Sequence, residues 1–344
     1  MNVPDHINEL TVIICCYNSA TRIAPTLRHL ACQRCPAGFT YEVLLVDNGS
    51  TDDTVETALQ VWKECNTPAA LKIVEEPKAG QYYARQKGVR EAASEYLVFC
   101  DDDNWLQPDY LYAAWQALRS DELIGAAGGD NLPVTDAGSY PDWFAEYADK
   151  YALGIPAKAS GYITERGFVL GAGMATRRSL FLAMYAEGFP SLLTGRNGSS
   201  LSTGDDFEYC KRLLLAGFRL YYEQRMELQH FIPRERLTLA YRERLMAGIL
   251  EAGKVINEYD LAIRVYKRNR SKNRWRLLLL TPFRIRLIRM KLSDRVLIDE
   301  QLTLFYLSPF NRAGYPVRTF IKRFMRYLKA LPDGQALSAK PAKQ

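Results

Sequence analysis

The sequence predicts an α/β domain built on a mostly parallel sheet, flanked by helices and followed by a helical extension. Short apolar runs rich in β-branched residues recur at 10–16, 41–46, 71–74 and 96–100. Turn-forming Asn, Asp, Gly or Ser follows the first two runs, and segments with helical spacing lie between the runs. Strands that alternate with helices in this way pair in parallel, because each crossover returns the chain to the same end of the sheet.

Each remaining element has its own signal. Apolar spacing places a helix through Leu27 and Leu30, and the polar segment 51–54 can cap a helix that begins after the second strand. A third helix is expected over 82–92, before the fourth strand. Further along, 205–215 has helical spacing with Gly217 as its stop, and a short strand follows at 218–222.

Composition excludes several classes of protein. The chain has 344 residues, of which 48% are hydrophobic and 24% charged, as in an ordinary folded protein with one large domain and a smaller appendage. Seven cysteines, an odd number, and no charged-then-apolar leader argue against a secreted disulfide framework, so we expect a reducing cytoplasm. Cys32 and Cys35 have half of a zinc spacing, but no second pair follows them.

The positive charge is unevenly placed. The net charge is +6, and the segment 264–291 carries many Lys and Arg with no Asp or Glu. Its longest apolar run, 277–280, is far below the ~20 residues of a membrane-spanning helix. Cations mixed with apolar residues suit the surface of an anionic bilayer, so a peripheral place on the inner face of the cell membrane is one expectation. A solvated helix face is the alternative, and no nucleic-acid-binding motif accompanies the charge.

Polar residues follow three of the predicted strands. Residues 17–18 follow the first strand, 47–48 the second and 101–104 the fourth. Ligands of parallel α/β sheets bind at the carboxyl ends of the strands. The three polar strand ends therefore predict one crevice.

The acidic cluster of Asp101, Asp102 and Asp103 predicts a cation site. Three adjacent carboxylates repel one another, and Mg²⁺ or Mn²⁺ binds carboxylate oxygens together with water and substrate phosphates. Alternation along a strand lets Asp101 and Asp103 reach the same side. The alternative is a helix N-cap, with Asp103 or Asn104 opening a helix over 105–118.

A second acidic cluster lies at 204–208 and contains Asp205 and Asp206. Acidic residues in a first helical turn are stabilised by the helix dipole by ~0.3–1 kcal/mol, which is explanation enough for a purely structural role. An acceptor hydroxyl, however, needs a carboxylate to take its proton, and a leaving diphosphate needs a cation to absorb charge. The two acidic clusters could supply these two functions.

Four segments in order resemble the motifs of the inverting, nucleotide-sugar-dependent family 2 glycosyltransferases, which have the GT-A fold. They are 12–18 (VIICCYN), 46–52 (VDNGSTD), 99–104 (FCDDDN, the DxD region) and 204–208 (GDDFE, the base motif). The sequence departs from the family pattern at Cys15 and Cys16 instead of Pro-Thr, Asn48 instead of Asp, and Asp205 instead of Glu. The resemblance covers roughly residues 10–230 and implies a catalytic domain over 1–235. The residue pattern beyond it predicts a basic and mainly helical region over 236–331 and a disordered tail over 332–344.

The resemblance implies a metal-dependent glycosyltransferase with a nucleoside-diphosphate sugar as donor, UDP-sugar favoured, and a divalent cation, Mn²⁺ or Mg²⁺. The acceptor would be a saccharide or a lipid-linked saccharide in cell-surface polysaccharide or glycan assembly. In the nucleotide-sugar site the resemblance places Tyr17 beside the nucleotide base and Asp47 on the imide of that base, together with Cys15, Asn18, Arg85, Asp101 and Asp102. It makes Asp103 the leading metal ligand, with Asp101 beside it. Asp206 or Asp205 would be the catalytic base.

Three further candidates have structural alternatives. His230 follows the base helix, where related enzymes can place a metal or diphosphate ligand, although a lone His is more often structural. Arg85 lies in a segment that resembles the family's Ala-Arg-Asn-x-Gly and could approach the diphosphate, or could be a cation on a helix surface. The glycines of 171–174 could admit a substrate close to the backbone or mark an ordinary turn.

Two other functions stay open at the level of sequence. A polyprenyl-phosphate acceptor is already ionised and needs little base catalysis, so it is the alternative substrate. A membrane-associated nucleotide-binding scaffold is the non-enzyme alternative, and its mark would be defective acidic motifs. A dehydrogenase is disfavoured because no Gly-x-Gly-x-x-Gly follows the first strand.

Overall fold

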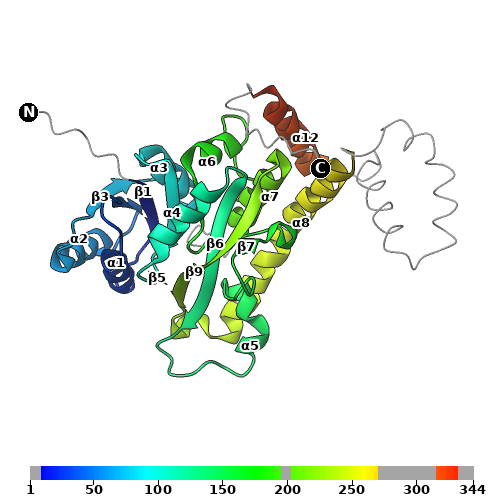
Figure 1. Cartoon of the computed structure of the whole chain (residues 1–344). Helices are drawn as coiled ribbons and strands as arrows, with labels where there is room; N and C mark the ends of the chain where they lie inside the picture. Colours follow the sequence, from blue (N-terminus) through cyan, green and yellow to red (C-terminus); the bar gives the residue numbers. More distant parts are fainter. Residues whose placement is uncertain (1–8, 194, 196–202, 270–314, 332–344) are drawn as a thin grey trace, which may run out of the picture.

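A mixed sheet with helices on both faces forms the centre of the protein (Figure 1). The computed structural model describes residues 9–193, 195, 203–269 and 315–331. Strands β1 (Leu10–Cys16), β2 (Tyr41–Asp47), β3 (Ala70–Glu75) and β4 (Tyr96–Asp101) lie in the order β3-β2-β1-β4 and all pair in parallel. The four strands expected from the sequence and their parallel pairing are confirmed.

The second half of the sheet is mixed. Beyond β4 the order continues β8-β6-β9-β5, and β7 pairs with β9. Of these contacts only β6 with β9 is parallel. The strands are β5 (Asn104–Leu106), β6 (Ile124–Val134), β7 (Gly161–Tyr162), β8 (Ala175–Arg177) and β9 (Arg219–Phe231). The short strand predicted at 218–222 is thus the start of a strand of 13 residues.

Alternate residues of the central strands feed two apolar cores. Val12 and Ile14 of β1 pack with α1 (Ile23–Ala31), α2 (Thr54–Cys65) and α4 (Tyr110–Ser120) on one face. Ile13 faces the other core, which is formed with α3 (Gln81–Glu91), α6 (Arg178–Met184) and α7 (Asp205–Ala216). This alternation is what a strand buried on both faces requires.

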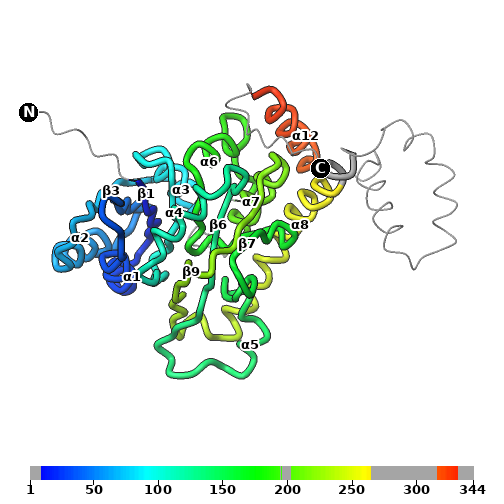
Figure 2. The backbone as a smooth tube through the Cα atoms, in the orientation of Figure 1, coloured from blue at the N-terminus to red at the C-terminus, as the bar shows by residue number. Residues whose placement is uncertain are grey.

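A long helix, α8 (Leu239–Asn269), follows β9 and packs against α7 and α12 (Tyr315–Ala330). Figure 2 shows the chain leaving β6 in a long loop that leads to α5 (Phe144–Tyr147). The remaining turns of helix are η1 (Ala148–Tyr151), η2 (Thr164–Arg166) and η3 (Arg234–Arg236). A third apolar cluster joins Phe144, Tyr151 and the first turns of α8, so packing attaches this region to the start of α8.

Several boundaries differ from the sequence predictions. The helix after the acidic cluster begins at Tyr110 with Asp109 as its N-cap residue, and Asn104 opens β5, so the idea that Asp103 or Asn104 caps a helix is wrong. Helix α8 begins at Leu239, later than the predicted 236, because residues 234–236 form η3. Most of the basic segment 264–291 and the tail 332–344 lie outside the described residues. Within the ranges described, no helix is long and apolar enough to cross a membrane.

Candidate active site

A cleft of about 740 Å³ opens at the carboxyl ends of β1 and β4, between the first turns of α3 and α7. Cavities of ~300–1,000 Å³ suit small-molecule ligands. The structure therefore places a pocket where the polar strand ends predicted a crevice. The predicted residues that line it are Cys15, Tyr17, Arg85, Asp101, Asp102, Asp103, Asp205, Asp206 and His230.

Asn18 and Asp47 stand at the strand ends beside this cleft and make local contacts. Asn18 has a φ of 50° and its Oδ1 accepts a hydrogen bond of 2.8 Å from the backbone N–H of Thr51. Asp47 Oδ1 accepts a bond of 3.2 Å from the backbone N–H of Ser50. Both residues thereby shape the turn after β2. Their contact with a nucleotide stays a prediction.

Asn48 explains one departure from the family pattern. Its side-chain amide donates to the backbone oxygens of Glu76 at 2.7 Å and Lys78 at 2.8 Å, and its Oδ1 accepts from the N–H of Gly80 at 2.8 Å. An ionised Asp could accept the last bond but could not donate the first two. Asn48 thus fixes the loop that leads into α3, the helix that carries Arg85.

Each carboxylate of the acidic cluster lies beside a different arginine. Asp102 Oδ2 lies 2.7 Å from Arg22 Nη2, Asp103 Oδ2 lies 2.8 Å from Arg236 Nη1, and Asp101 Oδ1 lies 3.5 Å from Arg85 Nη2. The repulsion expected among three adjacent carboxylates is therefore reduced by three guanidinium groups of the protein itself, of which Arg85 is shared with Asp205. Repulsion alone no longer argues for a metal ion, and any cation site has to be judged from its donors.

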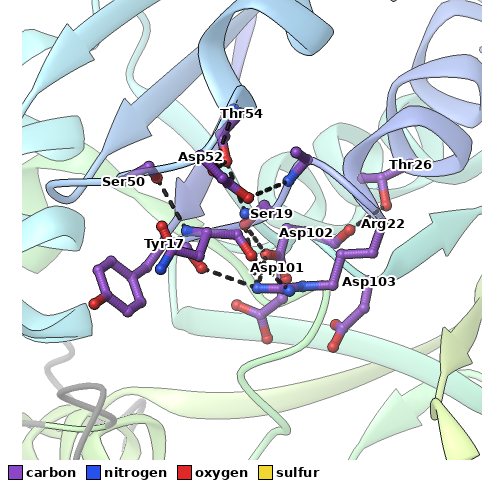
Figure 3. A network of polar contacts seen from close by, with 12 residues as sticks. Tyr17, Ser19, Arg22, Thr26, Ser50, Asp52, Thr54, Asp101, Asp102 and Asp103 are labelled. Atoms are coloured by element: carbon purple, nitrogen blue, oxygen red, sulfur yellow. Dashed lines mark hydrogen bonds and ion pairs between the residues drawn. The ribbon is translucent and has the colours of Figure 1, made fainter.

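Asp102 joins β4 to the loop after β1 (Figure 3). Its carboxylate accepts from the hydroxyl of Ser19 and pairs with Arg22, and its backbone oxygen accepts from Thr26 Oγ1 at 2.9 Å. Burial, and then the charge of Asp103, raise the pKa of Asp102. In Figure 3 the ring of Tyr17 projects away from this network. Asp102 thus serves the architecture of the cleft wall.

Asp103 of the acidic cluster and His230 of β9 together fit a divalent cation. His230 Nε2 lies 3.5 Å from Asp103 Oδ1, because β5 pairs Asn104 with His230. His230 Nδ1 is buried without a hydrogen bond among the described residues. A carboxylate oxygen and an imidazole nitrogen suit Mn²⁺ or Mg²⁺ when phosphate and water oxygens complete the shell. The chemistry of this pair fits a cation shared with a diphosphate.

Asp101, the third expected ligand, faces a different neighbour. Its Oδ1 accepts a bond of 3.1 Å from Gln81 Nε2 and also lies beside Arg85. Over the described ranges, no three His, Cys, Asp or Glu side chains are gathered as a metal centre. The metal role of Asp103, Asp101 and His230 accordingly stays a prediction, with Asp103 and His230 as the pair that the geometry favours.

Arg85 distinguishes the two carboxylates of the base motif. Its Nη1 lies 2.7 Å from Asp205 Oδ2, and only about 5% of Arg85 is exposed. Asp206 instead accepts backbone bonds, from the N–H of Gly171 at 2.7 Å and of Phe207 at 2.9 Å. Asp205 is thus neutralised by a buried arginine. Asp206 faces the cleft without an ion pair among the described residues.

The surroundings of Asp206 suit a general base. Desolvation, and then the charge of Asp205, raise the pKa of Asp206 to about 6. A carboxylate with a raised pKa is a stronger proton acceptor and is still ionised at neutral pH. Desolvation also raises the pKa of the Cys15 thiol to about 12, so this side chain is a neutral part of the wall. The geometry therefore favours Asp206 over Asp205 as the base.

Gly171 belongs to the same arrangement. A Cβ atom at this position would come within 3.0 Å of Asp206 Cβ and 3.2 Å of Arg85 Nη2. The close approach lets the Gly171 N–H reach Asp206. Residues 171–174 also form a turn, in which the N–H of Met174 donates to the Gly171 backbone oxygen at 3.3 Å. Gly173, with a φ of 78°, instead meets Tyr110, whose hydroxyl donates to the Gly173 backbone oxygen at 2.8 Å.

Two arginines of the site, Arg22 and Arg236, are not predicted by the sequence. Arg22 precedes α1 and resembles any surface cation in the sequence. Arg236 lies 133 residues from Asp103 along the chain. The only sequence signal was its place shortly after His230, in a short basic segment that follows Pro233.

The family model for glycosyl transferase family 2 matches residues 11–176. Residues 11–176, just under half of the chain, belong to this family. The matched region includes the acidic cluster 101–103 and ends in β8. Asp206, His230 and Arg236 lie beyond the matched region. The wall of the cleft that these three residues form is therefore described by the structure and not by the family match.

Two curated relatives are similar to parts of the family 2 region. The putative glycosyltransferase EpsH of Bacillus subtilis is 29% identical over 101 residues, which cover 29% of this chain and 28% of EpsH. The poly-beta-1,6-N-acetyl-D-glucosamine synthase of Staphylococcus aureus is 25% identical over 126 residues, 37% of this chain and 29% of the synthase. The match thus spans less than a third of either relative.

A solved structure shows the same fold. The crystal structure of Staphylococcus aureus TarS 1–349 in complex with UDP aligns with a TM-score of 0.50 at 16% identity, covering 75% of this chain and 65% of that chain. The mostly parallel sheet of the family 2 chain, with helices on both faces, is the GT-A fold, as the sequence motifs implied.

Proposed function

We propose that the protein is an inverting glycosyltransferase that moves a sugar from a nucleoside diphosphate to an acceptor hydroxyl. The observation that carries the proposal is Asp206, a carboxylate with a raised pKa that faces the same cleft as the strand-end cluster. Family membership supports the choice of reaction class. Carboxylates with a raised pKa that face a cleft are concentrated at functional sites, which favours an enzyme over a scaffold.

The reaction follows from the residues at the strand ends and at the start of α7, which face each other across the cleft. The acceptor oxygen attacks the anomeric carbon while Asp206 takes its proton, a carbon–oxygen bond forms, and the bond to the diphosphate oxygen breaks with its electrons going to the diphosphate. Attack from the face opposite the leaving group inverts the anomeric configuration. Arg85 keeps Asp205 paired, so that only one of the two neighbouring carboxylates acts.

The donor would lie along the strand ends. Tyr17, about 47% exposed, offers a ring for the base, and the end of β4 lies beside the diphosphate. A divalent cation held by Asp103 and His230, when bound, would supply charge for the leaving diphosphate. UDP is the first nucleotide to test, because the TarS structure contains it.

A saccharide hydroxyl is favoured over a polyprenyl phosphate as acceptor, because an ionised phosphate would make no use of a carboxylate like Asp206. The name of the Staphylococcus aureus relative, a polysaccharide synthase, supports cell-surface polysaccharide or glycan assembly as the context. A cytoplasmic site at the inner face of the membrane, with a lipid-linked saccharide as acceptor, completes the proposal.

Replacing Asp103 by Asn tests the proposed cation site that would bind the diphosphate of the donor. Loss of a charged ligand at a two-donor cation site should lower Mn²⁺-dependent release of nucleoside diphosphate from the donor sugar by ~100-fold or more, with the fold retained. The measurement is release of UDP from a panel of UDP-sugars at varied Mn²⁺, with circular dichroism as a check on folding. Wild-type turnover and wild-type Mn²⁺ dependence in this variant would overturn the assignment of Asp103.

A further inference from the structure

Arg236 occupies a fixed position on the wall of the cleft. Its backbone N–H donates to the oxygen of Pro233 at 2.8 Å, and its own backbone oxygen accepts from the hydroxyl of Tyr151 at 3.1 Å. The next residue, Leu237, is buried in the apolar cluster at the start of α8. The guanidinium is therefore delivered to Asp103 from a rigid turn, and 18% of the side chain remains exposed to the cleft.

The three arginines of the acidic cluster are held very differently. Arg22 also donates to the backbone oxygens of Asn18 at 2.9 Å and Tyr17 at 3.1 Å. Arg85 lies between two carboxylates and is almost fully buried. For Arg236, Asp103 is the single hydrogen-bonding partner of the guanidinium among the described residues. It is the arginine that can change partner at the cost of one ion pair.

A nucleoside diphosphate brings a suitable second partner into the cleft. Arginine binds phosphate oxygens with a planar fork of donors, and these charge-assisted bonds are among the stronger hydrogen bonds in proteins. Asp103 has His230 at its other oxygen, so the carboxylate is not left alone when Arg236 turns away.

We propose that Arg236 is a diphosphate-binding residue, which exchanges Asp103 for phosphate oxygens when the donor enters the cleft. The inference rests on the proposed function, because it takes the ligand of this cleft to be a nucleoside diphosphate. Arg236 would thus pair with Asp103 in the absence of ligand and bind the diphosphate when the donor is present.

The exchange couples two binding events. While Arg236 is paired with Asp103, a divalent cation and a guanidinium compete for one carboxylate. When Arg236 moves to the diphosphate, Asp103 becomes available, so nucleotide binding strengthens cation binding. The coupling is reciprocal, as linkage requires of any two ligands that bias the same equilibrium.

Calorimetric titration of the full chain with UDP and with GDP in excess EDTA tests the proposal. Wild-type protein should bind one of the two without a divalent cation, and Arg236→Gln should weaken that binding by about tenfold or more. Asp103→Asn, which removes the competing carboxylate, should keep or tighten it. Arg236→Lys should give an intermediate affinity, because it keeps the charge and loses the fork.

Arg234→Gln is the matched control. Arg234 lies two residues away in η3, with 64% of its side chain exposed and Asp136 as a surface partner at 3.6 Å. Its loss removes the same charge from the same turn, and the affinity for nucleotide should stay at the wild-type value. Equal losses in the two variants would mean a general effect of charge and would overturn the assignment of Arg236.

A second readout does not depend on nucleotide. Because Arg236→Gln removes the guanidinium that competes with a cation for Asp103, electron paramagnetic resonance should detect tighter Mn²⁺ binding to the nucleotide-free variant than to the wild type. Unchanged Mn²⁺ affinity together with unchanged nucleotide affinity in EDTA would refute the exchange. If the wild-type protein binds UDP or GDP only when Mn²⁺ is present, the inference about Arg236 fails and the proposed function stands. If it binds neither nucleotide, with or without Mn²⁺, the proposed function fails as well.

Discussion

Replacing Asp206 by Asn should lower kcat by ~10²–10⁴-fold and leave donor affinity close to wild type, because general base catalysis contributes a factor of this size. The exchange is nearly isosteric, and the Asn oxygen can still accept from Gly171. Donor titration by calorimetry and single-turnover transfer separate the two effects. Lost donor affinity with unchanged transfer from bound donor would move Asp206 out of the role of base.

Asp205→Asn is the matched control for this experiment. Asp205 is ion-paired with buried Arg85, so its loss removes a charge partner and should disturb both binding and turnover. The pH profile gives a second distinction. Since the pKa of Asp206 is raised to about 6, kcat should fall as the pH drops through that value and the base becomes protonated. The Asp206→Asn variant should lack this limb of the profile.

Replacing Arg212 by Met should destabilise the fold by ~3–5 kcal/mol, because it leaves a buried carboxylate without its partner. Arg212 and Glu208 of α7 are both fully buried and lie 2.6 Å apart. Arg212 also donates to the backbone oxygens of Met184 and Phe189, each at 2.7 Å, while Tyr259 of α8 donates to Glu208 at 2.8 Å. The ion pair thus joins α7 to α8 and to the segment after α6.

The measurement is the urea midpoint of unfolding, followed by circular dichroism. Lys254→Ala is the control, because Lys254 pairs with Glu251 on the exposed surface of α8, and such pairs contribute ~0–1 kcal/mol. A shift for Arg212→Met no larger than that of the control would contradict the structural importance of the buried pair.

The sequence located the elements whose signals are local. Strands β1 to β4 are apolar runs with turn residues at their ends. Helix α7 ends at Ala216, and the next residue, Gly217, has the φ of 100° that a helix stop favours. β6 escaped prediction because its sequence is rich in Gly and Ala. A Cβ atom on Gly129 would lie 1.7 Å from the backbone oxygen of Met226 in β9. The glycine that weakens the local signal is thus required by the partner strand.

In the candidate site, too, the residues with a local sequence signal could be predicted and those without one could not. Asp101–103 and Asp205–206 could be found because acidic residues stand directly after a strand or at a helix start. The ion pairs could not be predicted, because Arg22, Arg85 and Arg236 reach the carboxylates from distant parts of the chain. Of the three, only Arg85 was a predicted site residue. Because of these long-range ion pairs, repulsion among the three carboxylates no longer predicts a cation by itself, and the cation prediction rests on the donors of Asp103 and His230.

The most direct test of the account is a thermal-shift series of the full chain with UDP, GDP, ADP and CDP, each with and without Mn²⁺. A ligand that binds only the native state raises the unfolding temperature. The account predicts a shift for one base over the others, larger with Mn²⁺ than without it, and reduced in Asp103→Asn when Mn²⁺ is present. Absence of a shift with every nucleoside diphosphate, with and without Mn²⁺, would contradict the assignment of this cleft to a nucleotide-sugar.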